Sequence, residues 1–195
     1  YGLSDPGMED ALYDIESMRR FSRIDLGADV IPDETTILNF RHYLEQYQLT
    51  EKIFEMTKEY LADKGLLLRE GTIMDATIIN ASSSTKNESR TRDPEMKQTK
   101  KGNQWYFGMK AHVGTDSRRG LAHSVVVTSA AVHDSQVMDD LLHGEERAIY
   151  GDKAYSNTVK SVEFEAQGIE WHIDRKGSPV HPLTPDDLEW NHKQH

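Results

Sequence analysis

Two aspartates stand where the surrounding residues predict apolar strands. Asp75 interrupts the run GTIMDATII, and Asp152 directly follows the short apolar segment RAIYG. A carboxylate in such a place is costly unless a cation or water meets it. Two carboxylates brought close together repel, and a divalent cation between them removes the conflict. A metal held in this way supports phosphoryl transfer, including the cutting and joining of nucleic acid. The alternative is that each aspartate only forms a turn or a salt bridge.

The ligand types limit which metal could bind. The sequence has no cysteine, so thiolate sites are excluded, and a hard cation such as Mg²⁺ suits the remaining carboxylates and carbonyls. His112, His123 and His133 are common ligand types, but their spacing does not match a compact helical pair. We interpret Asp134 as a helix cap. Asp116, which precedes the sequence SRRG, we interpret as a turn residue.

The elements that must position Asp75 and Asp152 begin at residue 66. Hydrophobic patterns and turn signals predict the order β, β, β, α, β, α, β. These elements cover residues 66–81, 103–116, 121–130, 133–144, 147–156, 157–168 and 169–174. The second and third strands read as an antiparallel hairpin around SRRG. If the first and fourth strands lie side by side in one mixed sheet, Asp75 and Asp152 meet.

The first 65 residues have a different pattern. Apolar residues at helical intervals predict helices over 4–26, 31–49 and 50–65, with Pro32 in the first turn of the second and Gly65 ending the third. We therefore expect an α/β protein with an N-terminal helical region over 1–65 and a sheet-bearing core over 66–195. A chain of 195 residues allows one main domain with a smaller addition.

A basic segment lies between the first two predicted strands. The formal net charge of −10 argues against a nucleic-acid partner, but residues 86–110 are locally basic. Lysine and arginine there could neutralise DNA phosphates without reading sequence, or the segment could be a solvated loop over 81–102 with no such role. The candidate DNA-binding residues are Lys86, Arg90, Arg92, Lys97, Lys100, Lys101 and Lys110, with Lys153 added beside Asp152.

We also predict where Lys153 and the nearby aromatic side chains lie. Strand alternation would turn Lys153 to the face opposite Asp152. We expect Tyr155 on the same side as Asp152, where it packs in the core or stacks beside DNA. Trp105, Tyr106 and Phe107 are expected to pack in the sheet and core.

The chain contains no apolar stretch long enough to cross a membrane and no signal pattern. We expect a soluble, intracellular protein with no membrane partner. The chain opens at Tyr1 without a methionine and stops in mid-pattern at EWNHKQH, so we expect a fragment truncated at both ends.

An ordered set of motifs carries a family resemblance along essentially the whole chain. They are SDPGMEDALYDIESMRRF, IPDETTILNFRHYLE, GTIMDATIINASSS, WYFGMKAHVGTD, VVVTSAAVHDSQVMDDLL and YGDKAYSN. Together they resemble bacterial insertion-sequence DDE transposases of the group founded on insertion sequence five. The resemblance implies an RNase H-like core behind a helical region, with Asp75 and Asp152 as the first two catalytic, metal-binding carboxylates. It also implies Mg²⁺, with Mn²⁺ substituting, terminal-repeat and target DNA as partners, a homo-oligomer on DNA, and a nucleoid-associated cytoplasmic location.

The third carboxylate of such enzymes is a helical glutamate that we do not find. Glu189 precedes the place where it should lie, so we expect this chain to lack one metal ligand and to be impaired. Two alternatives stay open. One is an inactive fragment that binds DNA or inhibits an intact transposase, and the other is an RNase H-like nuclease, such as a resolvase, that does not join strands.

Overall fold

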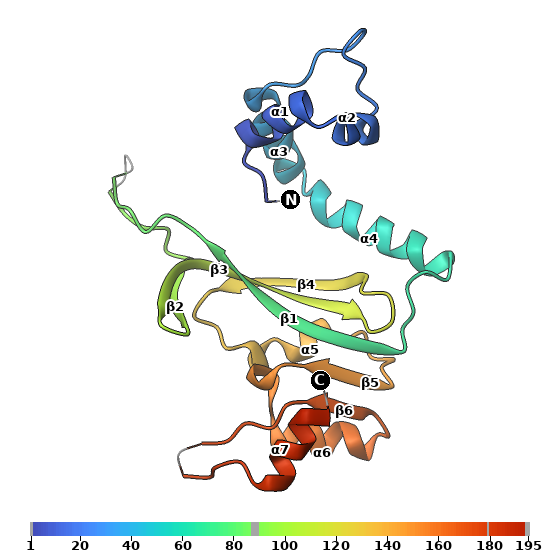
Figure 1. Ribbon diagram of the computed structural model, residues 1–195, viewed down its shortest axis with the longest axis vertical. Helices are drawn as coiled ribbons and strands as arrows, with labels where there is room; N and C mark the ends of the chain where they lie inside the picture. Colours follow the sequence, from blue (N-terminus) through green and yellow to red (C-terminus); the bar gives the residue numbers. More distant parts are fainter. Residues whose placement is uncertain (1, 87–89, 179, 194–195) are drawn as a thin grey trace. The chain divides into compact units, whose positions relative to one another are not determined.

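The computed structural model describes residues 2–86, 90–178 and 180–193 (Figure 1). The chain divides into two compact units, residues 1–57 and 58–195. We describe each unit by itself. No helix within the described residues is long and apolar enough to cross a membrane.

The first unit is helical, as predicted, but its first helix is broken. Residues 4–26 form α1 (Asp5–Asp14) and α2 (Glu16–Ser22) instead of one helix. Ile15 between them is extended, with φ −105° and ψ 101°. The Arg19 guanidinium donates a hydrogen bond of 2.9 Å to the carbonyl of Leu12, which α1 leaves without a helical partner.

Helix α1 packs against α3 (Glu34–Gln46). Ala11 and Leu12 are buried, and Arg41 of α3 reaches Asp5 at 2.6 Å. Asp33 is the N-cap of α3 and accepts a hydrogen bond from the N–H of Thr36, so Pro32 precedes the helix and the first-turn prediction was wrong. Helix α4 (Leu49–Asp63) crosses the boundary between the units.

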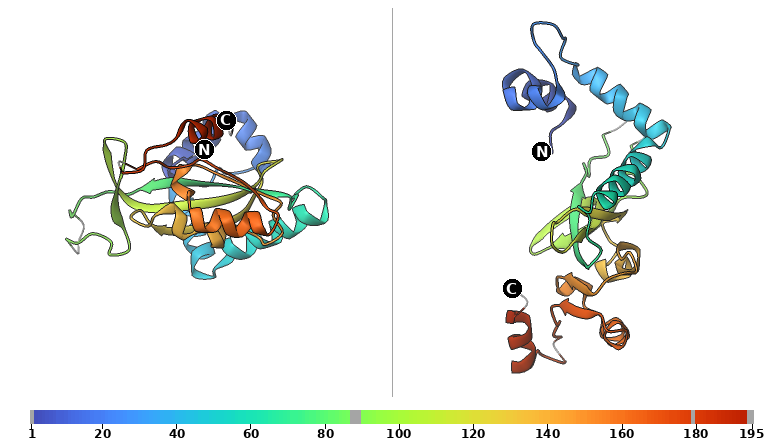
Figure 2. Two further views of the ribbon diagram at one scale, coloured as in Figure 1. Left: turned by 90° about the horizontal axis from the view of Figure 1, so that it is seen from below. Right: turned by 90° about the vertical axis from the view of Figure 1, so that its right-hand side faces the viewer.

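The second unit is built on a mixed sheet (Figures 1 and 2). Its strands are β1 (Gly71–Asn80), β2 (Lys97–Lys101), β3 (Gln104–Asp116), β4 (Ala122–Ser129), β5 (Ala148–Gly151) and β6 (Glu170–Ile173). The order is β2-β3-β1-β5-β6, with β4 also paired to β3. β1 runs antiparallel to β3 and parallel to β5, and β5 runs parallel to β6. The β3–β4 hairpin was predicted and is confirmed.

The long strand β3 holds two shorter strands on one edge. Its residues 104–108 pair with β2 and its residues 109–115 with β4. Gly108 lies at the change of partner with φ +152°, and a Cβ there would meet the Ile79 carbonyl oxygen at 2.1 Å. β2 itself was predicted to be loop. A two-residue turn, Gly102 and Asn103, joins it to β3, and Gly102 has φ +61°.

Short helical segments connect the later strands. Residues 133–144, predicted as one helix, contain the 3₁₀ turn η1 (Asp134–Gln136) and the single-turn helix α5 (Met138–Leu141). The predicted strand over 147–156 ends at Gly151 and continues as a second 3₁₀ turn, η2 (Lys153–Tyr155). Lys153 is therefore not a strand residue, and the alternation argument for its direction was wrong. Helix α6 (Thr158–Ala166) was predicted, whereas α7 (Pro185–Lys193) was not.

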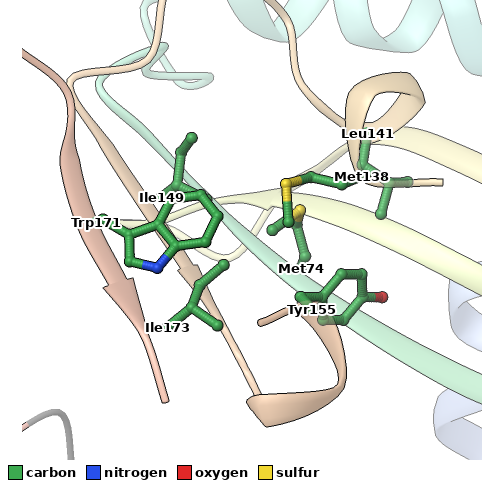
Figure 3. Close-up of a cluster of buried hydrophobic side chains, with 7 residues drawn as sticks. All are labelled: Met74, Met138, Leu141, Ile149, Tyr155, Trp171 and Ile173. Carbon is green, nitrogen blue, oxygen red and sulfur yellow. The ribbon is translucent and has the colours of Figure 1, made fainter. Parts of the chain in front are cut away.

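The core of this unit joins strand and helix residues (Figure 3). It contains Met74, Met138, Leu141, Ile149, Tyr155, Trp171 and Ile173, with Phe164 packed against it. Tyr155 and Phe107 are buried as expected, but Trp105 is 65% exposed and its predicted core position was wrong. The mixed sheet with its helices confirms the α/β prediction and is consistent with an RNase H-like core behind N-terminal helices.

Candidate metal centre and nucleic-acid interface

The β1–β5 strand pair places Asp75 and Asp152 at neighbouring positions. In the parallel register, Met74 pairs with Gly151, and each aspartate is the next residue of its chain segment. Asp152 keeps an extended backbone, with φ −75° and ψ 172°. Neighbouring strands lie about 4.8 Å apart, and equivalent positions of parallel strands face the same way. The expected adjacency of the first and fourth predicted strands is thus confirmed, and both aspartates line one cavity of about 230 Å³.

Each of these carboxylates is held through one oxygen. Asp75 Oδ1 accepts a hydrogen bond of 2.7 Å from the N–H of Ala76. Asp152 Oδ1 accepts one of 2.8 Å from the N–H of Ala154 and so caps η2. Among the described residues, Oδ2 of either side chain has no hydrogen-bond or ion-pair partner, and both residues are exposed. The backbone bonds orient the carboxylates while one oxygen of each stays available to a ligand.

The donor set fits a hard divalent cation. Mg²⁺ is typically bound by one or two carboxylates together with water and substrate phosphate oxygens. Asp75 and Asp152 supply that minimum. Within the ranges that the structure describes, no group of three or more histidine, aspartate or glutamate side chains could hold a metal. Any further ligands would therefore be water or phosphate oxygens, or residues outside this set.

An ion pair forms another wall of the same cavity. Lys110 Nζ donates to Asp134 Oδ1 at 2.7 Å and to the Val132 carbonyl at 2.9 Å. Only 12% of the Lys110 side chain and 18% of the Asp134 side chain are exposed. Asp134 is not the helix cap that we predicted, because the His133 side chain accepts the hydrogen bond from the N–H of Ser135 instead. Asp134 is a pocket residue whose charge Lys110 offsets.

The three candidate histidines do not form a metal site with one another. His112 Nε2 lies 3.0 Å from the Thr128 hydroxyl, and its Nδ1 lies 3.7 Å from Asp134 Oδ1. Burial lowers the pKa of His112 against the opposing field of Asp134. His123 faces Thr72 at 3.2 Å in a separate buried cluster, and His133 is exposed. Asp116 is the turn residue that was predicted: its Oδ1 accepts from the N–H groups of two residues in the following turn, Arg118 and Arg119.

Tyr155 also lines the cavity, on the same side as Asp152 as expected, because the turn η2 brings it there. Its ring lies in the core, and its hydroxyl oxygen is buried without a hydrogen-bond partner among the described residues. The pKa of Tyr155 is raised first by burial and then by the charges of Asp134, Asp75 and Asp152. The only sequence signal was its place three residues after Asp152.

The β2–β3 hairpin brings cations to the carboxylates. Thr99, Lys100 and Lys101 line the same cavity as Asp75 and Asp152, and Lys97 lies on the same exposed strand. The exposed Trp105 follows the hairpin turn, with Lys100 Nζ 5.9 Å from its ring centroid. Lysines beside an exposed aromatic ring are suited to contact phosphates and bases.

The remaining predicted DNA-binding residues do not lie on β2. Arg92 donates to the Ser83 carbonyl and lies over the Phe107 ring at 5.3 Å. Lys86, Arg90 and Lys153 are exposed, whereas Lys110 is committed to Asp134. Residues 87–89 of the predicted basic segment lie outside the described residues.

Two family models match this chain. Residues 67–184, more than half of the chain, match the family described as the transposase DDE domain. Residues 1–43 match a second family, described as a transposase domain (DUF772). The first match covers β1 to β6 and therefore includes both aspartates of the candidate metal centre.

Proposed function

Because this chain belongs to the family of the transposase DDE domain, we propose that it acts at the ends of a mobile element by Mg²⁺-dependent DNA cleavage and strand transfer. Asp75 and Asp152 are the proposed metal-binding catalytic residues. The observation that carries this proposal is the in-register pairing of Met74 with Gly151, which makes the two carboxylates neighbours in one cavity. Assignment to the group founded on insertion sequence five stays a prediction.

Bound Mg²⁺ would activate the attacking hydroxyl and offset charge on the leaving oxygen. The chain's own residues supply the rest. Asp75 and Asp152 present carboxylate oxygens whose direction the backbone N–H groups of Ala76 and Ala154 hold. Lys100 and Lys101 border the same cavity, where their charges would hold a DNA phosphate against the metal centre. A homo-oligomer on two element ends is part of the proposal.

The test uses the full chain and a plasmid that carries the terminal repeats of the element. Asp75→Asn and Asp152→Asn should each lower Mg²⁺-dependent nicking about 10³-fold, since losing a ligand removes several kcal/mol of transition-state stabilisation. Asp140→Asn, at an exposed aspartate of α5, is the matched control and should cut normally. Normal cutting by either site variant would contradict the metal assignment.

A second candidate is a transposase subunit that binds DNA or inhibits an intact partner without cutting. It is favoured by the finding that the described residues contain no group of three metal-binding side chains. DNA binding without cleavage in either Mg²⁺ or Mn²⁺ would support it. If cleavage occurs, joined products separate a transposase from a nuclease that only cuts.

A further inference from the structure

Tyr155 combines a buried ring with a hydroxyl that has no hydrogen-bond partner in the part of the chain that the structure describes. The side chain is 1% exposed, and its ring packs in the core cluster with Met74 and Ile149. The hydroxyl points away from the other six side chains of that cluster (Figure 3). Within the described residues it is buried and makes no hydrogen bond. A buried hydroxyl without a partner is unfavourable, and such groups call for an explanation.

The surroundings of this hydroxyl are acidic. Asp134, Asp75 and Asp152 all act on the phenol and, together with burial, raise its pKa. The phenol therefore stays protonated at neutral pH and can donate a hydrogen bond to an anionic oxygen. Tyr155 and all three aspartates line the same cavity.

The acceptors in this cavity are not equivalent. The Lys110 ammonium pairs with Asp134 through Oδ1, whereas among the described residues Asp75 and Asp152 each accept one backbone N–H bond and pair with no cation. The 3₁₀ turn η2 begins at Asp152's cap and ends at Tyr155, so one short turn carries both the carboxylate and the phenol. A metal that binds Asp152 would therefore act directly on the turn that carries Tyr155.

We propose that Tyr155 is a positioning residue of the metal centre, whose hydroxyl donates a hydrogen bond to a carboxylate oxygen or bound water of the Asp75–Asp152 pair when the metal is held. This inference rests on the proposed function and adds a residue to it. Groups that hydrogen-bond to metal ligands commonly change metal affinity or activity by about 10–100-fold when removed. The ring also fixes the position of η2, because it packs beside Gly151 and Met74.

The experiment measures Mn²⁺ affinity by titrating the full chain and detecting free Mn²⁺ by electron paramagnetic resonance. It compares Tyr155→Phe with the wild type. This variant keeps the buried ring and removes only the hydroxyl, so it should fold and melt at or above the wild-type temperature. We expect Mn²⁺ to bind about 10–100-fold more weakly, and nicking to need correspondingly more metal while the rate at saturating metal falls less. Tyr150→Phe is the matched control, because Tyr150 lies on β5 and stacks on His172 at 4.7 Å, outside the set of residues that line the cavity.

The outcomes separate the inference from the function on which it rests. Unchanged Mn²⁺ affinity and metal dependence in Tyr155→Phe would overturn the positioning role, even where Asp75→Asn and Asp152→Asn abolish binding. Unchanged affinity in the aspartate variants would overturn the metal centre itself. Weaker Mn²⁺ binding in Tyr155→Phe at wild-type or higher thermal stability, with Tyr150→Phe like wild type, would support the proposal.

Discussion

Strand β1 carries or contacts carboxylates in two different environments. One is the buried Glu146, and the other is the exposed pair Asp75 and Asp152. Near its start, Thr72 donates to Glu146 at 3.0 Å, and both side chains are buried. Three residues later, Asp75 is exposed beside Asp152. Glu146 Oε1 also accepts from the N–H of His143 at 2.6 Å, and Oε2 accepts from that of Gly144 at 2.8 Å.

The difference lies in how many carboxylate oxygens the fold uses. Both oxygens of Glu146 are hydrogen-bonded within a cluster that also contains His123, so this carboxylate is committed to structure. Asp75 and Asp152 each give one oxygen to the backbone and keep one available. A carboxylate that folding leaves half-satisfied at a cavity can take a cation, whereas a fully bonded and buried one stabilises the chain.

Replacing Glu146 should have the largest effect on stability. Glu146→Ala leaves the Thr72 hydroxyl and two backbone N–H groups without their acceptor, and each unpaired buried group costs about 1–3 kcal/mol. We expect the free energy of unfolding, measured in urea, to fall by about 3 kcal/mol or more. Glu145→Ala is the control, since Glu145 forms a surface ion pair with Arg69, and such pairs contribute about 1 kcal/mol or less. Equal losses in both variants would remove the distinction between the two carboxylate groups.

Metal should stabilise the chain only through Asp75 and Asp152. Metal at 100 times its dissociation constant should raise the free energy of unfolding of the wild type by about 2.7 kcal/mol. In Asp75→Asn or Asp152→Asn this gain should be lost, while metal-free stability changes by about 0.5 kcal/mol or less, because both residues are exposed. Thermal or urea unfolding with and without Mn²⁺ measures both quantities. A metal-dependent gain that survives in both variants would place the metal elsewhere.

Acid should lower the stability of the folded chain through the buried cluster of Thr72, His123 and Glu146. The pKa of His123 is lowered from 6.5 by burial first and then by the charge of His143, while Glu146 and Asp116 oppose the shift. The unfolded chain therefore binds more protons than the folded one as pH falls below about 6.5, and stability falls through that window down to the lowered pKa. Above this window the contribution is constant. The lowered pKa of His112 adds to the same trend.

Urea unfolding between pH 5 and 8 tests this dependence. His123→Gln keeps a polar group near Thr72 but cannot take up a proton, so its stability should fall less steeply with acid. His192→Gln, at an exposed residue of α7, should keep the wild-type slope. If His123→Gln also keeps that slope, the buried cluster is not the source of the acid sensitivity.

The two carboxylate groups were not equally visible in the sequence. Asp75 interrupts an apolar strand and Asp152 directly follows one, and the strand order brings them together without any knowledge of side-chain packing. Glu146 lies in the polar sequence HGEER, which reads as a surface turn, whereas in the fold it is buried and bonded to Thr72, far away in the sequence. The sequence placed Tyr155 on the side of Asp152, but it did not show that the hydroxyl is buried without a partner among the described residues, because η2 replaces the end of a predicted strand.

The basic hairpin was predicted in composition but not in structure. Strand β2 is a run of lysine, glutamine and threonine without apolar alternation, so its pairing with β3 had no hydrophobic signal. That pairing decides which lysines lie at the cavity that Asp75 and Asp152 line. Lys100 and Lys101 line the cavity, whereas Lys110, equally basic in the sequence, is held by Asp134.

The smallest expected effect concerns these hairpin lysines. Lys100→Gln and Lys101→Gln should each reduce the slope of log K against log salt concentration for DNA binding by about 0.9, since each phosphate contact releases counterions. Lys193→Gln is the control, because Lys193 pairs with Glu189 on α7. Fluorescence anisotropy with a labelled duplex at several salt concentrations measures the slope. An unchanged slope in the double variant Lys100→Gln/Lys101→Gln would mean that phosphates do not reach the metal pair across the hairpin, and the open carboxylates would need another path for DNA.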